Sequence, residues 1–326
     1  MRAIIPVAGF GSRLKPHTYT VPKVLLTVGD KPMLGHIIER LLEENITKAT
    51  FVIGHLGEMI KNYVEKNYPQ LQSDFVIQHE MLGLGHAIYT AIPTFDEEEI
   101  FIILGDTIFE VDLKNVFTSK ISSLGVKEVE DPSRFGVAVC KDGYIEQLIE
   151  KPSTPISRLA LVGLYYISDS KKLINALNTL IENNIKTRGE YQLTDALQLM
   201  IEKGEKFKTF KVEGWYDCGK PETLLETNRI LLNKIKDKNT KIDNVIVIQP
   251  SYISPKAYVN RAIIGPFATI SEGCRVVDSI IKNSILSPNA IVENSLLDNS
   301  IIGNNAIIKG NYKKLNAGDS SEIEFY

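Results

Sequence analysis

A short stretch near the N-terminus combines glycines with cations. Gly9–Leu14 reads Gly-Phe-Gly-Ser-Arg-Leu directly after an apolar run, and Lys23 follows within Val21–Val24. Glycines let main-chain N–H groups approach a phosphate chain, and nearby cations neutralise its charge. A dinucleotide fingerprint would need a third glycine where Leu14 stands, and a Walker A loop would need Gly-Lys-Ser/Thr. The stretch predicts a phosphate-binding loop of another kind, although two glycines also occur in purely conformational turns.

A carboxylate follows a second apolar run. Asp106 comes after Ile100–Leu104 and Gly105, which places it at the carboxyl end of an expected parallel strand, where ligands of open α/β sheets gather. Mg²⁺ prefers a few carboxylate oxygens together with phosphate oxygens and water. Asp106 is therefore a candidate magnesium ligand, and the alternative is a turn aspartate that caps the next segment.

The order of these and later segments resembles the sugar-1-phosphate nucleotidyltransferase family, in particular glucose-1-phosphate thymidylyltransferases that carry a C-terminal left-handed β-helix. The resemblance covers nearly all of residues 1–230. It rests on Gly9–Leu14, Pro22-Lys23, Lys31-Pro32, Gln78 with Gly83-Leu84-Gly85-His86-Ala87, Leu104-Gly105-Asp106, Phe135-Gly136-Val137, Glu150-Lys151-Pro152, Arg188-Gly189-Glu190 to Thr194-Asp195, and Trp215–Gly219.

The resemblance implies a magnesium-dependent reaction in which a sugar 1-phosphate attacks the α-phosphorus of a nucleoside triphosphate and pyrophosphate leaves. A sugar phosphate dianion is already nucleophilic, so no general base is required. The implied catalytic residues are Arg13, Lys23, Asp106 and Asp217, of which Asp106 and Asp217 would bind Mg²⁺. Nucleotide binding is expected of Ala8, Gly9, Gly11, Ser12, Arg13, Lys23, Gln78, Gly83 and Asp106, and sugar-phosphate binding of Gly136, Glu150, Lys151 and Gly163.

The sequence leaves more than one choice of nucleotide and of sugar as substrates. The amide of Gln78 can donate and accept, as a pyrimidine edge demands, and Gly83 leaves room for the base or ribose. Glucose 1-phosphate with dTTP leads, with UTP second. GTP with mannose 1-phosphate is a weaker alternative. A non-catalytic regulatory or scaffold subunit of the same layout is another, but such chains can lose active-site charges that this sequence keeps.

The elements that would position these residues follow from hydrophobic periodicity. Strands are expected at Ile4–Val7, Phe51–Ile53, Phe75–Ile77, Ile100–Leu104, Phe135–Val139 and Leu161–Tyr166, and helices at Leu34–Leu42, Met59–Val64, Lys171–Asn183, Leu193–Ile201 and Glu222–Leu232. The alternation of strands and helices predicts an α/β domain with a Rossmann-like, mostly parallel sheet.

After residue 246 the pattern changes to aliphatic residues at every fifth or sixth position, which predicts hexapeptide coils of a left-handed parallel β-helix, with a small β-sandwich as the alternative. The expected domains are 1–235 (nucleotidyltransferase), 236–246 (linker), 247–316 (β-helix) and 317–326 (tail). All five histidines precede the β-helix, which disfavours acyl transfer there and leaves assembly or regulation. The expected inward residues are Ile253, Val259, Ile264, Ile270, Val276, Ile281, Leu286, Ile291, Leu296, Ile302 and Ile307.

The composition of the chain bears on which classes of partner it can bind. Lys and Arg total 37 against 40 Asp and Glu, so the net charge of −3 provides no basic field for a nucleic acid. No run approaches the roughly 20 apolar residues of a membrane helix, and the three cysteines form no CxxC pair. We expect a cytoplasmic homo-oligomer that binds small molecules, without a nucleic acid or membrane partner.

Overall fold

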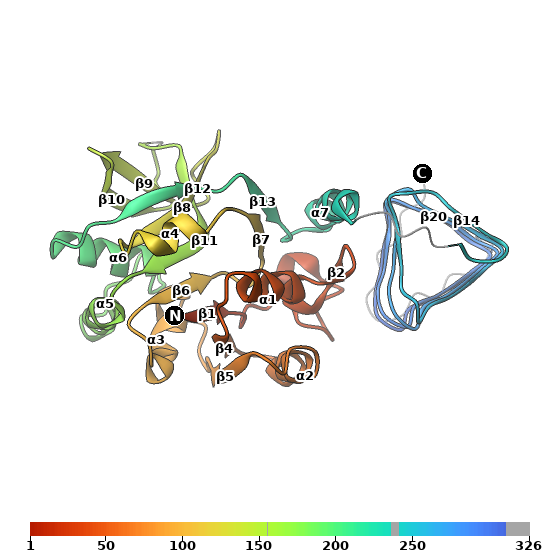
Figure 1. Cartoon of the computed structure of the whole chain (residues 1–326), viewed down its shortest axis with the longest axis horizontal. Coiled ribbons are helices and arrows are strands. Elements are labelled where there is room, and N and C mark those ends of the chain that lie inside the picture. The colour runs from red at the N-terminus through yellow and green to blue at the C-terminus, as the bar shows by residue number, and fades with distance from the viewer. Residues whose placement is uncertain (155, 236–240, 311–326) are drawn as a thin grey trace. The chain divides into compact units, whose positions relative to one another are not determined.

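The computed structural model describes residues 1–154, 156–235 and 241–310 (Figure 1). The first half of the expected linker (236–240), the end of the expected β-helix (311–316) and the expected tail (317–326) lie outside the described residues. Contacts divide the chain into two compact units. The first comprises Met1–Gly9 and Ile37–Trp215, and the second comprises Phe10–His36 and Tyr216–Tyr326.

The first unit is built on a nine-stranded, Rossmann-like sheet with the order β10-β9-β11-β6-β1-β4-β5, in which β8 pairs with β11 and β12 with β8. β6, β1, β4 and β5 run parallel, whereas β11 is antiparallel to β6. The carboxyl ends of the four parallel strands therefore meet at one edge. The strands are β1 (Arg2–Pro6), β4 (Lys48–Ile53), β5 (Gln72–Ile77), β6 (Ile100–Ile103), β8 (Ser123–Glu128), β9 (Gly136–Lys141), β10 (Tyr144–Glu150), β11 (Leu159–Ile167) and β12 (Lys208–Lys211).

Apolar faces of helices cover this sheet. Ile88, Leu177 and Leu197 come from three different helices and are fully buried in one cluster with Ile4 and Ile102 of the sheet. This burial explains why the expected strand and helix positions are confirmed within a few residues. The helices are α1 (Met33–Glu43), α2 (Gly57–Asn67), α3 (Leu84–Thr90), α4 (Lys114–Thr118), α5 (Ser170–Glu182), α6 (Leu193–Glu202) and α7 (Pro221–Lys234), with short 3₁₀ turns η1 (Ser12–Leu14), η2 (Lys23–Leu25) and η3 (Ile92–Thr94).

The second unit joins the glycine-rich loop, α7 and the β-helix. The short strands β2 (Thr27–Val28) and β3 (Lys31–Pro32) lie in this unit, whereas β7 (Thr107–Glu110) lies in the first unit and β13 (Gly214–Asp217) has two residues in each. Asn228 of α7 is fully buried, and its Oδ1 accepts hydrogen bonds from the Gly29 N–H at 2.7 Å and from the Thr269 hydroxyl at 2.8 Å. The Thr269 Oγ1 also lies 2.8 Å from the Gly29 carbonyl oxygen. The unit is therefore held together by buried polar contacts.

Residues 245–309 form a left-handed parallel β-helix of three four-stranded sheets, whose triangular coils are visible in Figure 1. Asparagine stands at many corners in the left-handed conformation, for example Asn244, Asn283 and Asn299, because its short polar side chain tolerates positive φ. The strands are β14 (Val245–Val247), β15 (Tyr252–Ile253), β16 (Tyr258–Asn260), β17 (Ala262–Ile264), β18 (Thr269–Ile270), β19 (Arg275–Val277), β20 (Ile280–Lys282), β21 (Ile285–Leu286), β22 (Ile291–Glu293), β23 (Leu296–Asp298), β24 (Ile301–Ile302) and β25 (Ile307–Lys309).

Three of the expected inward residues were wrong. Leu296 is 53% exposed and Ile307 46% exposed, and Ile291 is only partly buried. In each case the next residue is the inward one, as the fully buried Val292 illustrates. Neighbouring residues of a strand point to opposite faces, so an adjacent pair of aliphatic residues allows two registers that spacing alone does not separate. Every helix in the described ranges is too short or too polar to span a lipid bilayer.

Candidate active site

The glycine-rich loop turns tightly over a lysine. Gly11 has φ 61°, and a Cβ at this position would lie 2.9 Å from Cβ of Lys23 and 3.0 Å from Cγ2 of Thr18. The Thr18 hydroxyl donates to the Gly11 carbonyl at 2.9 Å. Only glycine fits both this conformation and this close approach. The turn therefore keeps the largely buried Lys23 side chain directly against the loop.

Arg13 and Asp217, which are far apart in sequence, converge on Gly219. A Cβ at Gly219 would lie 2.7 Å from Oδ1 of Asp217 and 2.8 Å from Nη2 of Arg13. The Gly219 N–H donates to that same Oδ1 at 2.8 Å, which fixes the carboxylate at the end of β13. Sequence analysis did not assign Gly219 a role, although it is the last residue of the Trp215–Gly219 segment. The second unit thus brings an expected phosphate-binding cation beside an expected metal ligand.

The carboxyl ends of β1 and β6 carry Ala8 and Asp106 in the first unit. The Gly105 N–H donates to the Pro6 carbonyl at 3.3 Å, so the two strand ends are joined. Gly163 of β11 has φ 85°, and its carbonyl accepts from the Leu104 N–H at 3.0 Å. A Cβ at Gly163 would lie 2.8 Å from Leu104 Cδ1. Gly163 therefore supports the turn that leads to Asp106.

Gln78 lies at the end of β5 and is held by His86 of α3. Its Nε2 is 3.1 Å from Nδ1 of His86 and 3.4 Å from the Gly83 carbonyl oxygen, and the side chain is largely buried. Burial lowers the pKa of His86 below its usual value, although the nearby Glu80 carboxylate and the Glu80 carbonyl act in the opposite direction. A neutral imidazole can accept through Nδ1 from the amide N–H. This contact leaves Oε1 of Gln78 as the part of the amide available to a ligand.

Neighbouring main-chain atoms leave no room for a side chain at Gly83. Its φ is 108°, and a Cβ there would lie 2.6 Å from the Tyr191 carbonyl oxygen. The Tyr191 N–H donates to Leu82 at 2.8 Å, and the Gly85 N–H donates to the Tyr191 carbonyl at 2.7 Å. These bonds fasten the segment after β5 to the segment before α6.

Glu150 and Lys151 form a charged pair at the end of β10. Lys151 Nζ lies 3.4 Å from Glu150 Oε1, and the Thr194 hydroxyl donates to Glu150 Oε2 at 2.8 Å. Glu150 pairs in register with Gly136 of β9, where a Cβ would come within 3.0 Å of Oε2. The cluster offers the Lys151 cation and the Glu150 carboxylate, which Thr194 orients. The carboxylate lies beside Gly136, which has no side chain. Such a set suits a ligand that carries both a phosphate and hydroxyl groups.

Sequence analysis did not assign roles to two residues that hold this cluster. One is Thr194, through the bond to Glu150. The other is Arg188, whose Nη2 donates to the Lys151 carbonyl at 2.7 Å. Arg188 and Gly189 have φ of 55° and 84° in a two-residue turn closed by mutual hydrogen bonds between Thr187 and Glu190. Asn or Gly is usual at the first position of such a turn, so the presence of Arg188 there was a sign in the sequence that this residue has a role.

Asp106 and Asp217 are both of a chemical type that Mg²⁺ prefers. Asp106 and Asp217 supply hard carboxylate oxygens, and Mg²⁺ in nucleotide sites is commonly bound by one or two carboxylates with substrate phosphates and water. Within the described ranges, no three or more His, Cys, Asp or Glu side chains gather as a metal cluster. Asp106 lies in the first unit and Asp217 in the second, and each supplies a carboxylate of the kind that binds Mg²⁺ together with phosphate oxygens.

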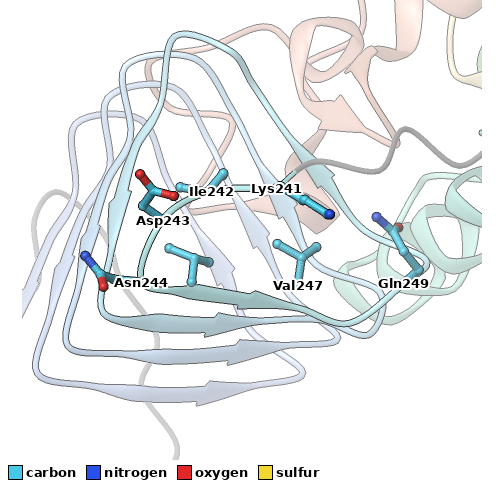
Figure 2. A pocket seen from close by; sticks show the side chains of 7 residues that line it. Lys241, Ile242, Asp243, Asn244, Val247 and Gln249 are labelled. Atoms are coloured by element: carbon cyan, nitrogen blue, oxygen red, sulfur yellow. The ribbon is translucent and has the colours of Figure 1, made fainter.

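A separate hollow of about 440 Å³ lies in the first coil of the β-helix (Figure 2). It is lined by Lys241, Ile242, Asp243, Asn244 and neighbouring residues up to Gln249. Ile242 and Val247 also pack against the β-helix core, so the hollow is the open end of that core. None of the sequence-predicted site residues lines it.

The site residues fall into two sets. In the second unit, the structure brings Gly11 to Lys23 and brings Arg13 to Asp217, with Ser12 in the same turn. In the first unit, Gly136, Glu150 and Lys151 lie together, Gln78 lies beside Gly83, and Gly163 supports the turn before Asp106. Ala8 and Gly9 follow β1 in that unit.

The chain is similar to known nucleotidyltransferases in sequence and in fold. The chain is 36% identical over 258 residues to the low-salt glycan biosynthesis nucleotidyltransferase Agl11 of Haloferax volcanii, covering 76% of this chain and 71% of that protein. It is 29% identical to a glucose-1-phosphate thymidylyltransferase of Streptomyces antibioticus, covering 88% and 87%. The solved structure of a UDP-glucose pyrophosphorylase with UDP-glucose superposes with a TM-score of 0.61 at 27% identity, covering 72% of this chain and 98% of that one. A family model described as nucleotidyl transferase matches residues 2–234, and the chain therefore belongs to this family of sugar-phosphate nucleotidyltransferases.

Proposed function

We propose that this chain condenses a sugar 1-phosphate, glucose 1-phosphate in the first place, with dTTP or UTP to give a nucleotide sugar and pyrophosphate. The observation that carries the proposal is the convergence of Arg13 and Asp217 on Gly219, beside the loop that packs on Lys23. A cation next to a carboxylate suits a triphosphate that brings a divalent ion. The relatives named for thymidylyl transfer and for UDP-glucose support the two nucleotides.

In the proposed reaction, a phosphate oxygen of the sugar 1-phosphate forms a bond to the α-phosphorus. The bond between the α-phosphorus and the oxygen that bridges to the β-phosphate breaks, and pyrophosphate carries away that electron pair. Arg13 and Lys23 would neutralise charge on the triphosphate, while Asp106 and Asp217 would hold Mg²⁺. When bound, Mg²⁺ supplies charge neutralisation at the phosphates. Positioning of two mutually repelling anions is the main contribution of the protein.

The sugar 1-phosphate is assigned to the Glu150 and Lys151 cluster. The Lys151 ammonium would pair with the phosphate, and Glu150, oriented by Thr194, would accept from sugar hydroxyls. Gly136 would leave space for the ring beside Glu150, because even a Cβ there would crowd that carboxylate. Gly163 would act through the turn that leads to Asp106.

The base is assigned to Gln78 and Gly83. Because the amide nitrogen of Gln78 contacts His86 and Gly83, its oxygen is the free acceptor for a base N–H. Thymine and uracil carry such an N–H at N3, whereas cytosine has an acceptor there. This observation supports dTTP and UTP over CTP and does not separate them from GTP, whose base also has a ring N–H donor.

The test is pyrophosphate release from purified protein with Mg²⁺. Each of dTTP, UTP, GTP and CTP is combined with glucose 1-phosphate, mannose 1-phosphate and other hexose 1-phosphates. We expect the highest kcat/KM for dTTP or UTP with glucose 1-phosphate. A preference for GTP with mannose 1-phosphate would replace the proposed substrates, and no turnover with any pair would support a non-catalytic subunit.

A matched pair of variants tests the site. Asp106→Asn removes a charge without a change in volume and should lower kcat by about 10²- to 10³-fold, in line with losses of electrostatic catalytic groups. Asp142→Asn makes the same chemical change at the exposed turn between β9 and β10 and should keep normal turnover. Normal turnover in Asp106→Asn would contradict the assignment.

A further inference from the structure

Three parallel strands of the first unit end side by side at the edge of the sheet that leads to Gln78. β1, β4 and β5 are neighbours in the sheet, with β4 in the middle. The Gln78 N–H donates to the Ile53 carbonyl at 2.9 Å, so β4 and β5 stay in register past their ends. The residues that follow the three strands therefore form a row at this edge, in the order Ala8, Gly54 and Gln78.

The tip of the Met81 side chain lies at the middle of this row. A Cβ at Gly54 would lie 3.1 Å from Cε of Met81, 3.0 Å from the Ala8 carbonyl oxygen and 3.1 Å from Ala8 Cβ. The absence of a side chain at Gly54 therefore leaves space that the Met81 methyl group occupies. Met81 is 38% exposed, so its side chain lines this edge and is not part of the core. Sequence analysis assigned Met81 no role.

A nucleotide bound as proposed would cross this row. The base is assigned to Gln78 after β5, and Ala8 and Gly9, which are expected to bind the nucleotide, follow β1. A ligand that contacts both ends of the row must pass the end of β4, where the Met81 tip lies. Neighbouring strands are about 4.8 Å apart, which is within reach of one ring. The polarizable thioether of a methionine also packs well against a ring.

We propose that Met81 is a specificity-determining residue that restricts the base subsite to a single ring and so excludes purine nucleotides. The inference rests on the proposed function, because it takes the base to bind at Gln78. In uracil and thymine, the N–H that would donate to Gln78 and the nitrogen that carries the ribose belong to one ring. In guanine they belong to two fused rings, so the ribose must lie farther from Gln78. The added ring then needs the space beside Gly54 that Met81 fills.

The test compares nucleotides that differ only in the base. GTP is compared with UTP, and dGTP with dTTP, by calorimetric titration with Mg²⁺ in the absence of a sugar phosphate and by kcat/KM with glucose 1-phosphate. Met81→Ala should raise the preference for GTP over UTP by about tenfold or more, in binding and in kcat/KM. Met81→Leu keeps the volume of the side chain and should keep the selectivity of the unmodified protein. Met81→Val should act in the same direction as Met81→Ala and serves if that variant fails to fold, as judged by thermal melting.

Met59→Ala is the matched control, because Met59 of α2 is also 38% exposed and the chemical change is the same. It should leave the selectivity unchanged, since a general loss of stability affects all nucleotides alike. Tighter binding of GTP than of UTP by the unmodified protein would overturn the proposal. So would an unchanged selectivity in folded Met81→Ala, even where the enzyme uses UTP or dTTP as proposed. If no nucleotide supports turnover, the proposed function fails, and the ratios of the dissociation constants still decide the role of Met81.

Discussion

At the scale of single residues, Gly219 sets the distance between opposite charges. The carboxylate of Asp217 and the guanidinium of Arg13 both lie within 3 Å of where a Cβ would stand. Because the Gly219 N–H also fixes Oδ1 of Asp217, the main chain at this position both orients the proposed metal ligand and leaves space for the arginine. A methyl group would force one of the two charges to move.

Gly219→Ala should therefore lower kcat by about 10²-fold while the protein stays folded, as expected when catalytic groups shift by about 1 Å. Gly303→Ala is the control, because its Cβ would meet His17 Nδ1 at 3.5 Å, an ordinary contact. Steady-state kinetics and thermal melting of both variants check the prediction. Equal kcat in Gly219→Ala and the unmodified enzyme would show that the close approach has no role.

We expect His86 to give the proposed nucleotide site a pH dependence. Its pKa lies below the ordinary value of 6.5 because burial disfavours the charged ring, so the imidazole is neutral at neutral pH. The groups around it are the Glu80 carboxylate and the rings of Tyr89 and Tyr191. As the pH falls through this lowered pKa, Nδ1 gains a proton and can no longer accept from Gln78, which must reorient.

The KM for the nucleotide should accordingly rise as the pH falls below the ordinary histidine value of 6.5 and through the lowered pKa of His86, with a smaller effect on kcat. In His86→Asn, the side-chain oxygen can accept from Gln78 without titrating, so the KM should stay flat over the same range. Kinetics between about pH 5 and pH 8 at saturating sugar phosphate decide the matter. The same acid-dependent rise in KM in His86→Asn would exclude His86 as its source.

At the scale of elements, a buried arginine joins the amino ends of the parallel strands, opposite the edge that leads to Ala8, Gln78 and Asp106. Arg2 of β1 is 2% exposed and makes two hydrogen bonds to Asp96, at 2.7 and 2.9 Å. It also bonds Thr50 of β4 at 3.1 Å and Asp74 of β5. The Arg2 guanidinium holds the pKa of Asp96 well below its usual value of 3.8.

A carboxylate whose pKa is lowered on folding stabilises the fold above its unfolded-state pKa, and this stabilisation is lost as the pH falls toward the folded-state value. The free energy of unfolding should therefore decline as the pH drops below about 4. Asp96→Asn should lower the free energy of unfolding at neutral pH and make its decline at acid pH less steep. Urea unfolding from about pH 7 to pH 2.5 measures both, with Asp142→Asn as the control. If the loss of stability at acid pH is the same in Asp96→Asn, other carboxylates cause it.

How well the sequence predicts an element depends on whether the contacts that define it are made by residues near to one another or far apart in the sequence. Apolar runs predict β1 and β6 correctly, because burial on both faces leaves a local pattern. The bond from Thr194 to Glu150 joins a helix to a strand, so no local pattern reports it. Leu296 and Leu297 are both aliphatic, and only the lateral pairing of Leu296 with Ile280 decides which one faces the core. The family resemblance assigns roles to the charged residues, which stay predictions, and it assigned none to Thr194 or Gly219, which contact them.

At the scale of the whole molecule, the β-helix is bonded to the loop region that carries two of the proposed catalytic cations. Phe10–His36 clusters with α7 and the β-helix, and Thr269, Asn228 and Gly29 form a buried polar junction within this unit. Arg229 of α7 adds a bond to Asn299 at 2.7 Å. We infer that the β-helix restrains the segment that follows Lys23, in addition to any role in assembly.

Thr269→Val tests this restraint, because it keeps the shape of the side chain and removes the hydroxyl that contacts Gly29 and Asn228. Loss of a buried hydrogen bond costs about 1–3 kcal/mol, which should speed local opening around Gly29 by about tenfold or more. Hydrogen exchange of the amides in residues 27–32 measures the opening, and the KM for the nucleotide should rise several-fold in parallel. Thr179→Val, at a partly exposed position of α5, is the control. Unchanged exchange in Thr269→Val would mean that the β-helix does not restrain this loop, and a changed KM would then need another cause.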